Sequence, residues 1–449
     1  MSAYSLQKSF DLIDRIITAD VVHGFPSAQL AVRLNGSPVY THSWGKVTGE
    51  TLYDLASNTK MYSIVYAMQH LVTEGKLRVT DRIMDYLGER FAENVIDVSS
   101  IGQDTVFPDR SRSWKAKMTI RDVLCHQAGF IANPVCFYDD PQGPFYAGAD
   151  GSQRTRQRTL DALCRMPLMC EPGTAALYSD ADYILLCFVV EQITGQSLQD
   201  YLKQLFWEPL GLKHMTFLPL QNGFAPKDCA PTELHGNTRD GAVFFPGIRN
   251  YLLQGEVHDE KAWHCMGGIS GHAGLFSNAD DLARLADLML DGKEWFSKDV
   301  LAAFTAPVSP ACDQWGLGWW RQGSMKRTHY FGTHSSRATI GHQGWTGTLT
   351  MIDPEVRLTI ALLTNKIHTP VTDPTHNPNR FDGNHYTTAT LGFVPQLIED
   401  CLHGYDPQEA LSAMVEARRK QYEEDPCEAS RLALDAILEA TGSVLGAKL

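Results

Sequence analysis

A serine and a lysine three positions apart, Ser57 and Lys60, stand at the start of an apolar segment with helical periodicity. Residues at positions i and i+3 lie on the same face of a helix, so the hydroxyl and the amine would be neighbours. A hydroxyl beside an amine can act as a nucleophile with its own base, without a histidine. The pair therefore predicts nucleophilic chemistry at Ser57.

Two other Ser-x-x-Lys matches, at Ser5 and Ser43, lack this setting. Ser5 belongs to a predicted amphipathic helix and reads as ordinary surface. Ser43 ends an alternating segment that predicts a strand, where a spacing of three puts its lysine on the opposite face. Ser57 would instead lie in the first turn of a helix that Gly75 ends, where free N–H groups and the helix dipole favour developing negative charge. We therefore interpret only Ser57 as the nucleophile.

A second proton carrier is offered by Tyr178, which lies between a Pro-Gly turn and a helix that begins near Asp180. Beside Lys60, its phenol would have a pKa lowered by the ammonium and could shuttle protons. The alternative is a tyrosine that only packs at a loop.

The segment around Gly344 offers the other groups that such a site needs. It reads as an edge strand whose glycines permit close backbone approach by a ligand. The backbone N–H groups of Trp345 and Ser57 would form an oxyanion hole. His342 would offer a positive or hydrogen-bonding group to a substrate carboxylate. The alternative is a glycine-bearing core strand with a surface histidine.

The elements that must position these residues follow an α/β pattern. The predicted strands are residues 27–34, 37–45, 339–343, 347–353 and 357–364. The clearest predicted helices are residues 5–20, 119–125, 183–193, 278–290 and 389–402. Asn35-Gly36 is a strong two-residue hairpin signal between the first two strands. We expect an antiparallel sheet that is built from both ends of the chain.

We predict three parts along the chain. An α/β sheet domain comprises residues 1–80 and 226–405, and a mostly helical domain of residues 81–225 is inserted into it. Residues 406–449 form an appended helical hairpin, because two Asp-Pro-x-Glu start signals each precede a helix. We expect this hairpin to pack on the parent domain rather than to bind a partner. The active site would lie where the first two domains meet.

The composition of the 449 residues limits the classes of function. An apolar content of 43% is enough for one large core or for two domains that share an interface. A net charge of −13 argues against binding to nucleic acid or to an anionic membrane surface. No stretch approaches the about 18 uncharged apolar residues of a membrane span.

The N-terminus and the cysteines both predict a cytoplasmic protein. The first residues lack the apolar core of a signal peptide, and the ten cysteines are scattered without CxxC spacing. Buried reduced thiols are the interpretation we favour over disulfides or a zinc site. A signal peptide removed beforehand would leave the same N-terminus, and the protein would then be periplasmic or extracellular.

A metal site is an alternative raised by three histidines, His235, His258 and His272, together with Asp259. No HxH or HxxxH spacing links them. We therefore predict neither a metal nor a cofactor.

Together, these segments resemble the motifs of the serine β-lactamase and penicillin-binding-protein superfamily, and above all of its class C β-lactamase-like branch. Ser57 and Lys60 match the Ser-x-x-Lys motif of that family. Tyr178 matches its Tyr-x-Asn motif, with Asp180 in place of the asparagine. The family's Lys/His-x-Gly motif is matched at His342. The resemblance runs from about residue 10 to residue 405 and leaves the C-terminal hairpin out.

The resemblance implies a β-lactamase/transpeptidase-like fold and an acyl-enzyme on Ser57. Lys60 and Tyr178 would manage the proton, and the N–H groups of Ser57 and Trp345 would hold the oxyanion. The implied substrate contacts are Asp180, His342, Gly344 and Thr346. The implied activity is hydrolysis of a small acyl compound or short peptide, like a D-Ala-D-Ala carboxypeptidase or an esterase, without metal or cofactor. A β-lactamase and a catalytically silent sensor of peptidoglycan fragments are the alternatives.

Two residues depart from the pattern of that family. Asp180 replaces an amide. It would either pair with Lys60, keep it charged and favour Tyr178 as the base, or face away and cap the following helix. His342 replaces the lysine of most β-lactamases, and a neutral imidazole is a weaker carboxylate anchor at pH 7. The oligomeric state stays open.

Overall fold

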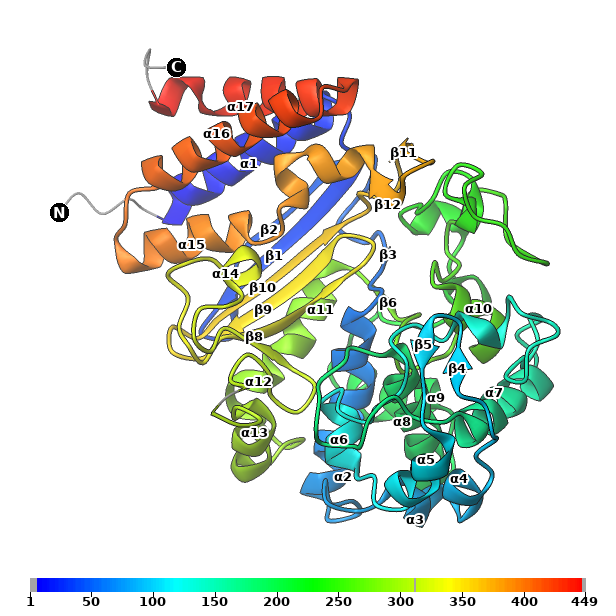
Figure 1. Ribbon diagram of the computed structural model, residues 1–449. Coiled ribbons are helices and arrows are strands. Elements are labelled where there is room, and N and C mark those ends of the chain that lie inside the picture. The colour runs from blue at the N-terminus through cyan, green and yellow to red at the C-terminus, as the bar shows by residue number, and fades with distance from the viewer. Residues whose placement is uncertain (1–5, 311, 446–449) are drawn as a thin grey trace.

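A six-stranded antiparallel sheet lies at the centre of the computed structural model, which describes residues 6–310 and 312–445 (Figure 1). The strand order in the sheet is β2-β1-β10-β9-β8-β7. Its strands are β1 (Ser27–Leu34), β2 (Ser37–Gly45), β7 (Trp320–Arg321), β8 (Ile340–Gly344), β9 (Thr348–Asp353) and β10 (Leu358–Thr364). The short strands outside it are β3 (Tyr53–Asp54), β4 (Ser100–Ile101), β5 (Asp104–Thr105), β6 (Phe276–Ser277), β11 (Val371–Asp373) and β12 (Asn377–Phe381).

Helices make up most of the remaining regular structure. The α-helices of the first half of the chain are α1 (Leu6–Val22), α2 (Tyr66–Thr73), α3 (Ile83–Leu87), α4 (Arg90–Glu93), α5 (Pro108–Lys115), α6 (Ile120–Leu124), α7 (Gln153–Arg165), α8 (Asp180–Thr194) and α9 (Leu198–Leu202). The later ones are α10 (Glu260–Met266), α11 (Ala279–Ala286), α12 (Leu288–Asp291), α13 (Lys298–Thr305), α14 (Thr328–Phe331), α15 (Phe393–His403), α16 (Gln408–Glu424) and α17 (Glu428–Leu445).

The sheet joins the two ends of the chain, as the sequence predicts. β1 pairs antiparallel with β10, from Ala28 opposite Thr364 to Leu34 opposite Leu358. The β1–β2 hairpin turns at Asn35 and Gly36, whose φ angles are 53° and 76°. Positive φ at both central residues is the geometry that an Asn-Gly hairpin turn requires.

The predicted helices are confirmed in position, with differences at their ends. α8 begins at Asp180, as expected for the helix after Tyr178 and three residues before the clearest predicted stretch, 183–193. The Ser179 hydroxyl accepts a hydrogen bond from the Ala181 N–H and caps the helix. The helix predicted over 278–290 is divided at Asp287 into α11 and α12, and Asn278 caps α11 as expected. Ser5, in the first predicted helix, lies outside the described residues.

Each face of the sheet packs against its own hydrophobic core, and different helices contribute to the two cores. α1, α15 and the C-terminal hairpin cover one face (Figure 1). Helices α2, α8 and α11 belong to a larger core on the other face, which also takes Ala31, Ile340 and Leu363 from the sheet. Residues of 81–225 and of the sheet thus share one core. The division into three domains stays a prediction.

The C-terminal hairpin packs against the rest of the chain. Its helices α16 and α17 contribute buried apolar side chains to the core that they share with α1. The buried residues are Leu411, Met414, Val415, Ala436, Ile437 and Ala440. Residues 446–449 lie outside the described part of the chain. The hairpin therefore extends the helical layer over one sheet face.

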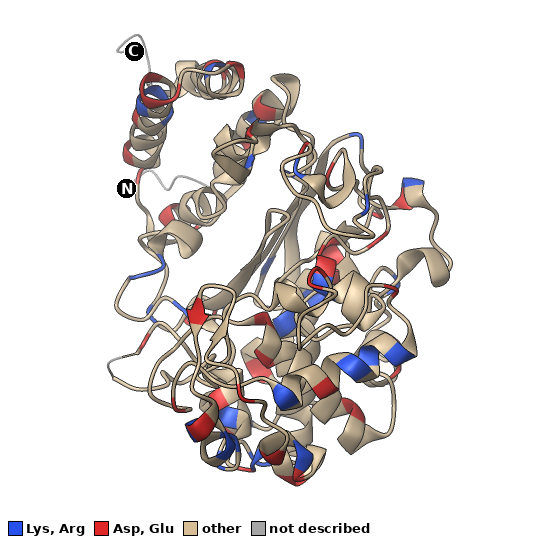
Figure 2. Ribbon diagram, turned by 45° about the vertical axis from the view of Figure 1, so that its right-hand side comes forward, with Lys and Arg blue, Asp and Glu red and all other residues tan. Residues whose placement is uncertain are grey.

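Charged residues are distributed unevenly over the fold. Figure 2 shows acidic and basic residues interspersed on the helices, whereas the central sheet carries few of them. Within the described residues, no helix combines the length and the apolar character that crossing a membrane requires. All ten cysteines carry free thiols, five of them buried.

Candidate active site

Ser57 lies in a tight turn between β3 and the helix that follows. The turn is closed by hydrogen bonds from the N–H groups of Asn58 and Thr59 to the carbonyls of Leu55 and Ala56, at 3.1 and 3.0 Å. Ala56 has a φ of 45°, a left-handed conformation that few non-glycine residues adopt. Strained backbone of this kind is frequent at functional sites.

The helix after Ser57 differs from the predicted α-helix. Residues Lys60–Val65 form a π-helical segment before α2 begins at Tyr66. The Ser63 hydroxyl donates to the Thr59 carbonyl at 2.6 Å inside this segment. A π-helical turn rotates the side chains relative to an α-helix, and such turns occur often at functional sites. The apolar periodicity could not reveal it.

The structure brings Ser57 and Lys60 together. The Lys60 side chain is fully buried, and its Nζ donates to Ser57 Oγ at 3.1 Å. Nζ also donates to Asp180 Oδ1 at 2.9 Å and to the His272 carbonyl at 3.1 Å. Burial disfavours the charged ammonium, but the Asp180 carboxylate more than offsets this, so the pKa of Lys60 is raised. Lys60 is therefore held as an ammonium against the Ser57 hydroxyl.

Tyr178 lies beside this pair, with its ring centroid 4.8 Å from Lys60 Nζ. Its pKa departs from the expected direction. Burial raises the pKa of the phenol, and the opposing effect of the Lys60 ammonium does not reverse it. The expected lowering is therefore wrong, because the loss of solvent around the ring outweighs the nearby positive charge.

Asp180 pairs with Lys60 and does not cap α8, which decides between the two sequence-based alternatives. Its second oxygen, Oδ2, lies 3.2 Å from the Nζ of Lys261 on α10. Burial alone would raise the pKa of Asp180, but the two ammonium groups hold it well below its usual range. Asp180 is therefore a carboxylate shared between two lysines.

Lys261 extends this chain of charges and was missed by sequence reasoning. Its Nζ donates to Asn133 Oδ1 at 2.8 Å and lies 3.6 Å from Asp259 Oδ2. Asp259 Oδ1 in turn lies 2.8 Å from His272 Nε2. No motif or periodicity marks Lys261, because its partners come from segments far apart in the sequence.

The predicted β8–β9 segment docks onto the Ser57 turn through side-chain hydrogen bonds. Asn58 Nδ2 donates to Thr348 Oγ1 at 3.0 Å, and Thr350 Oγ1 donates to Asn58 Oδ1 at 2.8 Å. The Thr348 hydroxyl donates to the Leu55 carbonyl at 3.0 Å. Asn58 is fully buried, so these bonds are shielded from water. They fix the turn of Trp345 next to the turn of Ser57.

Gly344 and Thr346 have structural contacts that the sequence did not predict. A Cβ at Gly344 would lie 2.3 Å from the Leu55 carbonyl oxygen, so the close approach is made by the protein's own backbone. The Thr346 hydroxyl is buried and donates to the Asp54 carbonyl at 2.7 Å. This bond uses the only proton of the hydroxyl, so while it lasts Thr346 Oγ1 can only accept a hydrogen bond from a substrate.

β8 is second from the sheet edge, because β7 pairs with its first two residues, Ile340 and Gly341. The residues of β8 after Gly341 have no partner in β7. The prediction that this segment is an edge strand therefore holds only for the C-terminal end of β8.

His342 is neither a positive group nor a surface histidine. Its side chain is 1% exposed and lies against the ring of Trp320, with centroids 4.4 Å apart. Burial and the Lys60 charge hold its pKa well below the usual range. Nδ1 lies 2.6 Å from the Gln343 carbonyl, so the ring's proton is on Nδ1 and Nε2 carries a lone pair. Of the two roles expected for His342, a positive group or a hydrogen-bonding group, the first does not fit the neutral, buried ring.

Trp345 stands in the turn between β8 and β9, where the Gly347 N–H donates to the Gly344 carbonyl at 3.0 Å. Its side chain is 41% exposed. The Arg239 guanidinium lies 6.0 Å from its ring centroid. The Trp345 turn thus borders both Ser57 and solvent.

A buried His–Asp pair behind Tyr178 was also missed. His126 Nδ1 lies 2.8 Å from Asp182 Oδ2 and accepts the Ser179 N–H at 3.2 Å. Its ring centroid is 4.4 Å from that of Tyr178. Burial lowers the pKa of His126 to about 3, so an uncharged imidazole ring packs against the Tyr178 phenol. His126 directly follows the predicted helix 119–125, but nothing in its spacing to Tyr178 predicts a contact.

The histidines of the metal alternative do not meet. His258 bonds with Glu233, whereas His272 lies against Asp259. The possible donor atoms of Asp180, Asp259 and His272 lie within 4.8 Å of one another. The ammonium groups of Lys60 and Lys261 already form ion pairs with these carboxylates. They supply the positive charge that a metal cation would bring.

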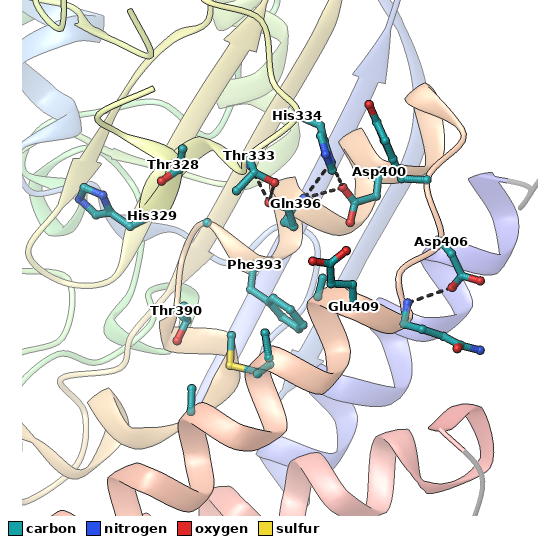
Figure 3. Close-up of a pocket in the computed structure, with 17 residues that line it drawn as sticks. Thr328, His329, Thr333, His334, Thr390, Phe393, Gln396, Asp400, Asp406 and Glu409 are labelled. Atoms are coloured by element: carbon teal, nitrogen blue, oxygen red, sulfur yellow. Dashed lines mark hydrogen bonds and ion pairs between the residues drawn. The ribbon is translucent and has the colours of Figure 1, made fainter. Parts of the chain in front are cut away.

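A cavity of about 740 Å³ lies elsewhere, between α14, α15 and α16 (Figure 3). We call it the tail cavity. Figure 3 shows His334, Gln396 and Asp400 joined by hydrogen bonds on one wall, with Phe393 and Glu409 nearby. None of the predicted site residues lines it.

A family model described as Beta-lactamase matches residues 13–385. A relative from Escherichia coli (strain K12), named "Putative D-alanyl-D-alanine carboxypeptidase", is 43% identical over 404 residues, which are 85% of this chain and 88% of that protein. The N-acetylmuramyl-L-alanine amidase of Bacillus subtilis (strain 168) is 41% identical over 415 residues, 88% of this chain and 89% of that protein.

Solved structures agree on the fold. The octameric penicillin-binding protein homologue from Pyrococcus abyssi superimposes with a TM-score of 0.59 at 18% identity, covering 91% of this chain and 81% of that one. The family model spans the sheet strands and the helices between them. The fold is β-lactamase/transpeptidase-like, as the motifs predict. This chain therefore belongs to the Beta-lactamase family of serine hydrolases.

Proposed function

We propose that the protein hydrolyses an amide bond in a small peptidoglycan-type fragment through an acyl-enzyme on Ser57. The observation that carries this proposal is the contact of 3.1 Å between Lys60 Nζ and Ser57 Oγ, with Lys60 held by Asp180 on its other side. A buried ammonium beside a hydroxyl stabilises the negative charge that develops on the oxygen during attack.

Lys60 and Tyr178 act as one proton-carrying unit. Both pKa values are raised, so the resting unit holds an ammonium and a neutral phenol. The reactive unit has lost one proton, and Asp180 favours the form in which Lys60 stays charged and Tyr178 is the phenolate. Tyr178 then takes the Ser57 proton as the Oγ–C bond forms. It gives this proton to the leaving amine as the C–N bond breaks.

The oxyanion is held by the N–H groups of Ser57 and Trp345 in this proposal. The hydrogen bonds between Asn58, Thr348 and Thr350 support it, because they lock the two turns together. Donors that are fixed before the reaction cost no reorganisation when charge develops. Water then attacks the acyl carbon and loses a proton to Tyr178, and Tyr178 passes that proton to Ser57 Oγ as the ester bond breaks.

The bond cleaved is inferred from the names of two relatives. One is described as a D-alanyl-D-alanine carboxypeptidase and the other as an N-acetylmuramyl-L-alanine amidase, and both names denote cleavage of an amide at an alanine. We infer the same class here and expect esters of similar shape to react as well. A short acyl-alanine peptide is the substrate we would test first.

The test is a probe and substrate screen of the wild type against Ser57→Ala. We expect a fluorophosphonate to add one equivalent to the wild type and none to the variant, by intact-protein mass spectrometry. N-acyl-D-Ala-D-Ala and muramyl-L-alanine should be hydrolysed by the wild type only. No adduct and no turnover on folded wild type would contradict the proposal.

A β-lactamase remains the second candidate, and the family membership favours it. The neutral, buried His342 argues for slow acylation by β-lactams rather than rapid turnover. Nitrocefin hydrolysis faster than peptide hydrolysis would reverse this order. A silent sensor would instead bind a fragment tightly in both the wild type and Ser57→Ala, without turnover.

A further inference from the structure

The cationic side chains near the Ser57 and Trp345 turns are almost all neutralised by acids. Lys60 and Lys261 share Asp180, and Lys261 also faces Asp259. Arg239, beside the Trp345 ring, is paired with Glu233 and Glu260. These cations already have counter-charges within the protein, so they attract a substrate anion only weakly.

Arg327 has a different environment on the far side of His342. Its guanidinium lies 4.7 and 4.0 Å from the ring centroids of Trp315 and Trp320. Its Nε donates to the Gln314 carbonyl at 3.3 Å. The two indole faces cover the cation, so a ligand would reach it only at its edge.

Lys366 lies on the other side of the Trp345 turn and has no such partners. It follows β10, whose Thr364 N–H donates to the Gly347 carbonyl at 3.1 Å. A Cβ on Gly347 would lie 2.9 and 3.2 Å from Cγ and Cδ of Lys366, so the lysine stem runs directly along this turn. Gly347 has a φ of 107°, which only glycine adopts readily. The absence of a side chain there leaves room for the lysine.

Within the described residues, Lys366 Nζ has neither a hydrogen bond nor an ion pair. The side chain is half-buried. Burial alone lowers its pKa to about 8, with no carboxylate contributing. A half-buried ammonium without a counter-charge is costly, and the cost falls when an anion binds. Such a group beside an oxyanion turn is suited to receive a charged end of the substrate.

We propose that the Lys366 ammonium binds a free carboxylate of the substrate beside the Trp345 turn. This assigns to Lys366 the anchoring that the sequence assigned to His342, whose only ring proton is donated to the Gln343 carbonyl. The substrate class is thereby narrowed to amides that carry a free carboxylate, such as a peptide with an intact C-terminus. The inference rests on the proposed function, because it places a substrate next to Ser57.

The experiment compares two substrates that differ in one charge, N-acyl-D-Ala-D-Ala and its C-terminal carboxamide. For Lys366→Met we expect kcat/KM on the free acid to fall at least about tenfold, chiefly through KM, because a charged hydrogen bond is lost. On the carboxamide the change should stay within about twofold. Lys366→Arg should retain most of the activity on the free acid. Lys420→Met, at an exposed position on α16, is the matched control.

Three results would overturn the inference. Equal losses on both substrates would make Lys366 merely structural. No loss on the free acid would show that the carboxylate binds elsewhere, and a selective loss in Arg327→Met would locate it there.

The fluorophosphonate labelling rate separates this inference from the proposed function, because that probe carries no carboxylate and should label Lys366→Met as fast as wild type. If the wild type neither labels nor turns over, calorimetric binding of the two dipeptides to Ser57→Ala, with and without Lys366→Met, still decides the carboxylate contact. Equal affinity for acid and carboxamide in Ser57→Ala would reject it.

Discussion

The Ser57 site and the tail cavity differ in what they are built from. Around Ser57, lysines and acids alternate in contact, with Lys60, Asp180, Lys261 and Asp259 joined at 2.9, 3.2 and 3.6 Å. The tail cavity is roomy, and among the described residues its lining includes the acids Asp400, Asp406 and Glu409 but no lysine or arginine. Its wall holds a His334–Asp400 pair that stacks on Tyr405. Chemistry in this molecule is thus expected where opposite charges are crowded rather than at the roomy tail cavity.

The comparison also shows two ways of burying an acid. Asp180 is buried with two ammonium groups, which keep it ionised. Glu399, on α15 near the tail cavity, is fully buried. Within the described part of the chain, neither of its oxygens has a hydrogen bond, although His403 Nε2 lies 3.4 Å from Oε2. Burial raises its pKa to about 9, and Asp353 and Asp400 add to the effect. The first acid can work as a charge at neutral pH, whereas the second is kept as a neutral carboxyl.

Replacing Lys60 should give the largest loss of activity. A small loss would contradict the view that the crowded charges at the Ser57 site carry the chemistry. Lys60→Met removes the ammonium next to Ser57, so we expect the fluorophosphonate labelling rate to fall about 10³-fold or more. Lys420→Met is the matched control and should label normally. Circular dichroism must show that Lys60→Met is folded, since one member of a buried ion pair is lost. Labelling within tenfold of wild type would remove Lys60 from the mechanism.

Replacing Asp180 should shift the pH dependence rather than abolish activity. The carboxylate raises the pKa of Lys60, so Asp180→Asn should make proton loss from the Lys60–Tyr178 unit easier. The rising limb of the kcat/KM profile should therefore move to lower pH by about one unit. A profile measured from pH 5 to 10 tests this, and a move to higher pH would contradict it.

The same substitution has a stability signature with a fixed sign. Asp180 has a depressed pKa in the folded state, so its contribution to stability is present above its ordinary pKa near 3.8 and is lost as the pH falls through the lower folded value. Asp180→Asn should therefore destabilise the protein at pH 7 and change little in strong acid. Urea unfolding at both pH values measures this difference.

Glu399→Gln should have a smaller effect and the opposite pH dependence. The folded state holds the Glu399 proton more tightly than the unfolded state, so stability falls as the pH rises from 4.5 towards about 9. Glutamine mimics the protonated form, and we expect the melting temperature to rise on the order of 2–4 °C at pH 8, with little change at pH 5. Glu409→Gln, exposed at the tail cavity, is the control. An equal gain at both pH values would refute the explanation by ionisation.

Filling the tail cavity should have the smallest effect on catalysis. Ala413 is an exposed residue of the cavity lining, so Ala413→Phe adds bulk there without touching the Ser57 site. We expect kcat/KM to stay within about twofold of wild type. A tenfold loss would show that the two regions are coupled.

Local sequence signals predicted the parts of the fold and site that depend on neighbours in the chain. Asn35-Gly36 predicted the hairpin because the turn needs two positive φ angles. Ser57 and Lys60 meet because a tight turn joins them: the Lys60 N–H donates to the Ser57 carbonyl at 3.1 Å, and the π-helical segment begins only at Lys60. The strand patterns predicted five of the six sheet strands, because each pattern is local; the two-residue β7 was not predicted.

The rest depended on contacts between distant segments. Lys261 carries no local mark, yet after Lys60 it contributes most to lowering the pKa of Asp180. The burial of His342 under Trp320 could not be read from a strand pattern, because β7 has only two residues. The pKa of Tyr178 rises through burial by the surrounding fold, which spacing does not encode.

The pairing of β1 with β10 has a consequence for the newly made protein. Ala28 and Thr364 are partners, 364 − 28 = 336 residues apart. A ribosome that adds about 5–20 residues per second would finish β1 many seconds before its partner strand. During that interval the chain would carry Ser57 and Lys60 without the Trp345 turn, and β1 would have an open edge prone to wrong pairing. Activity is thus expected to appear only after the last strands leave the ribosome, and the nascent chain would need protection until then.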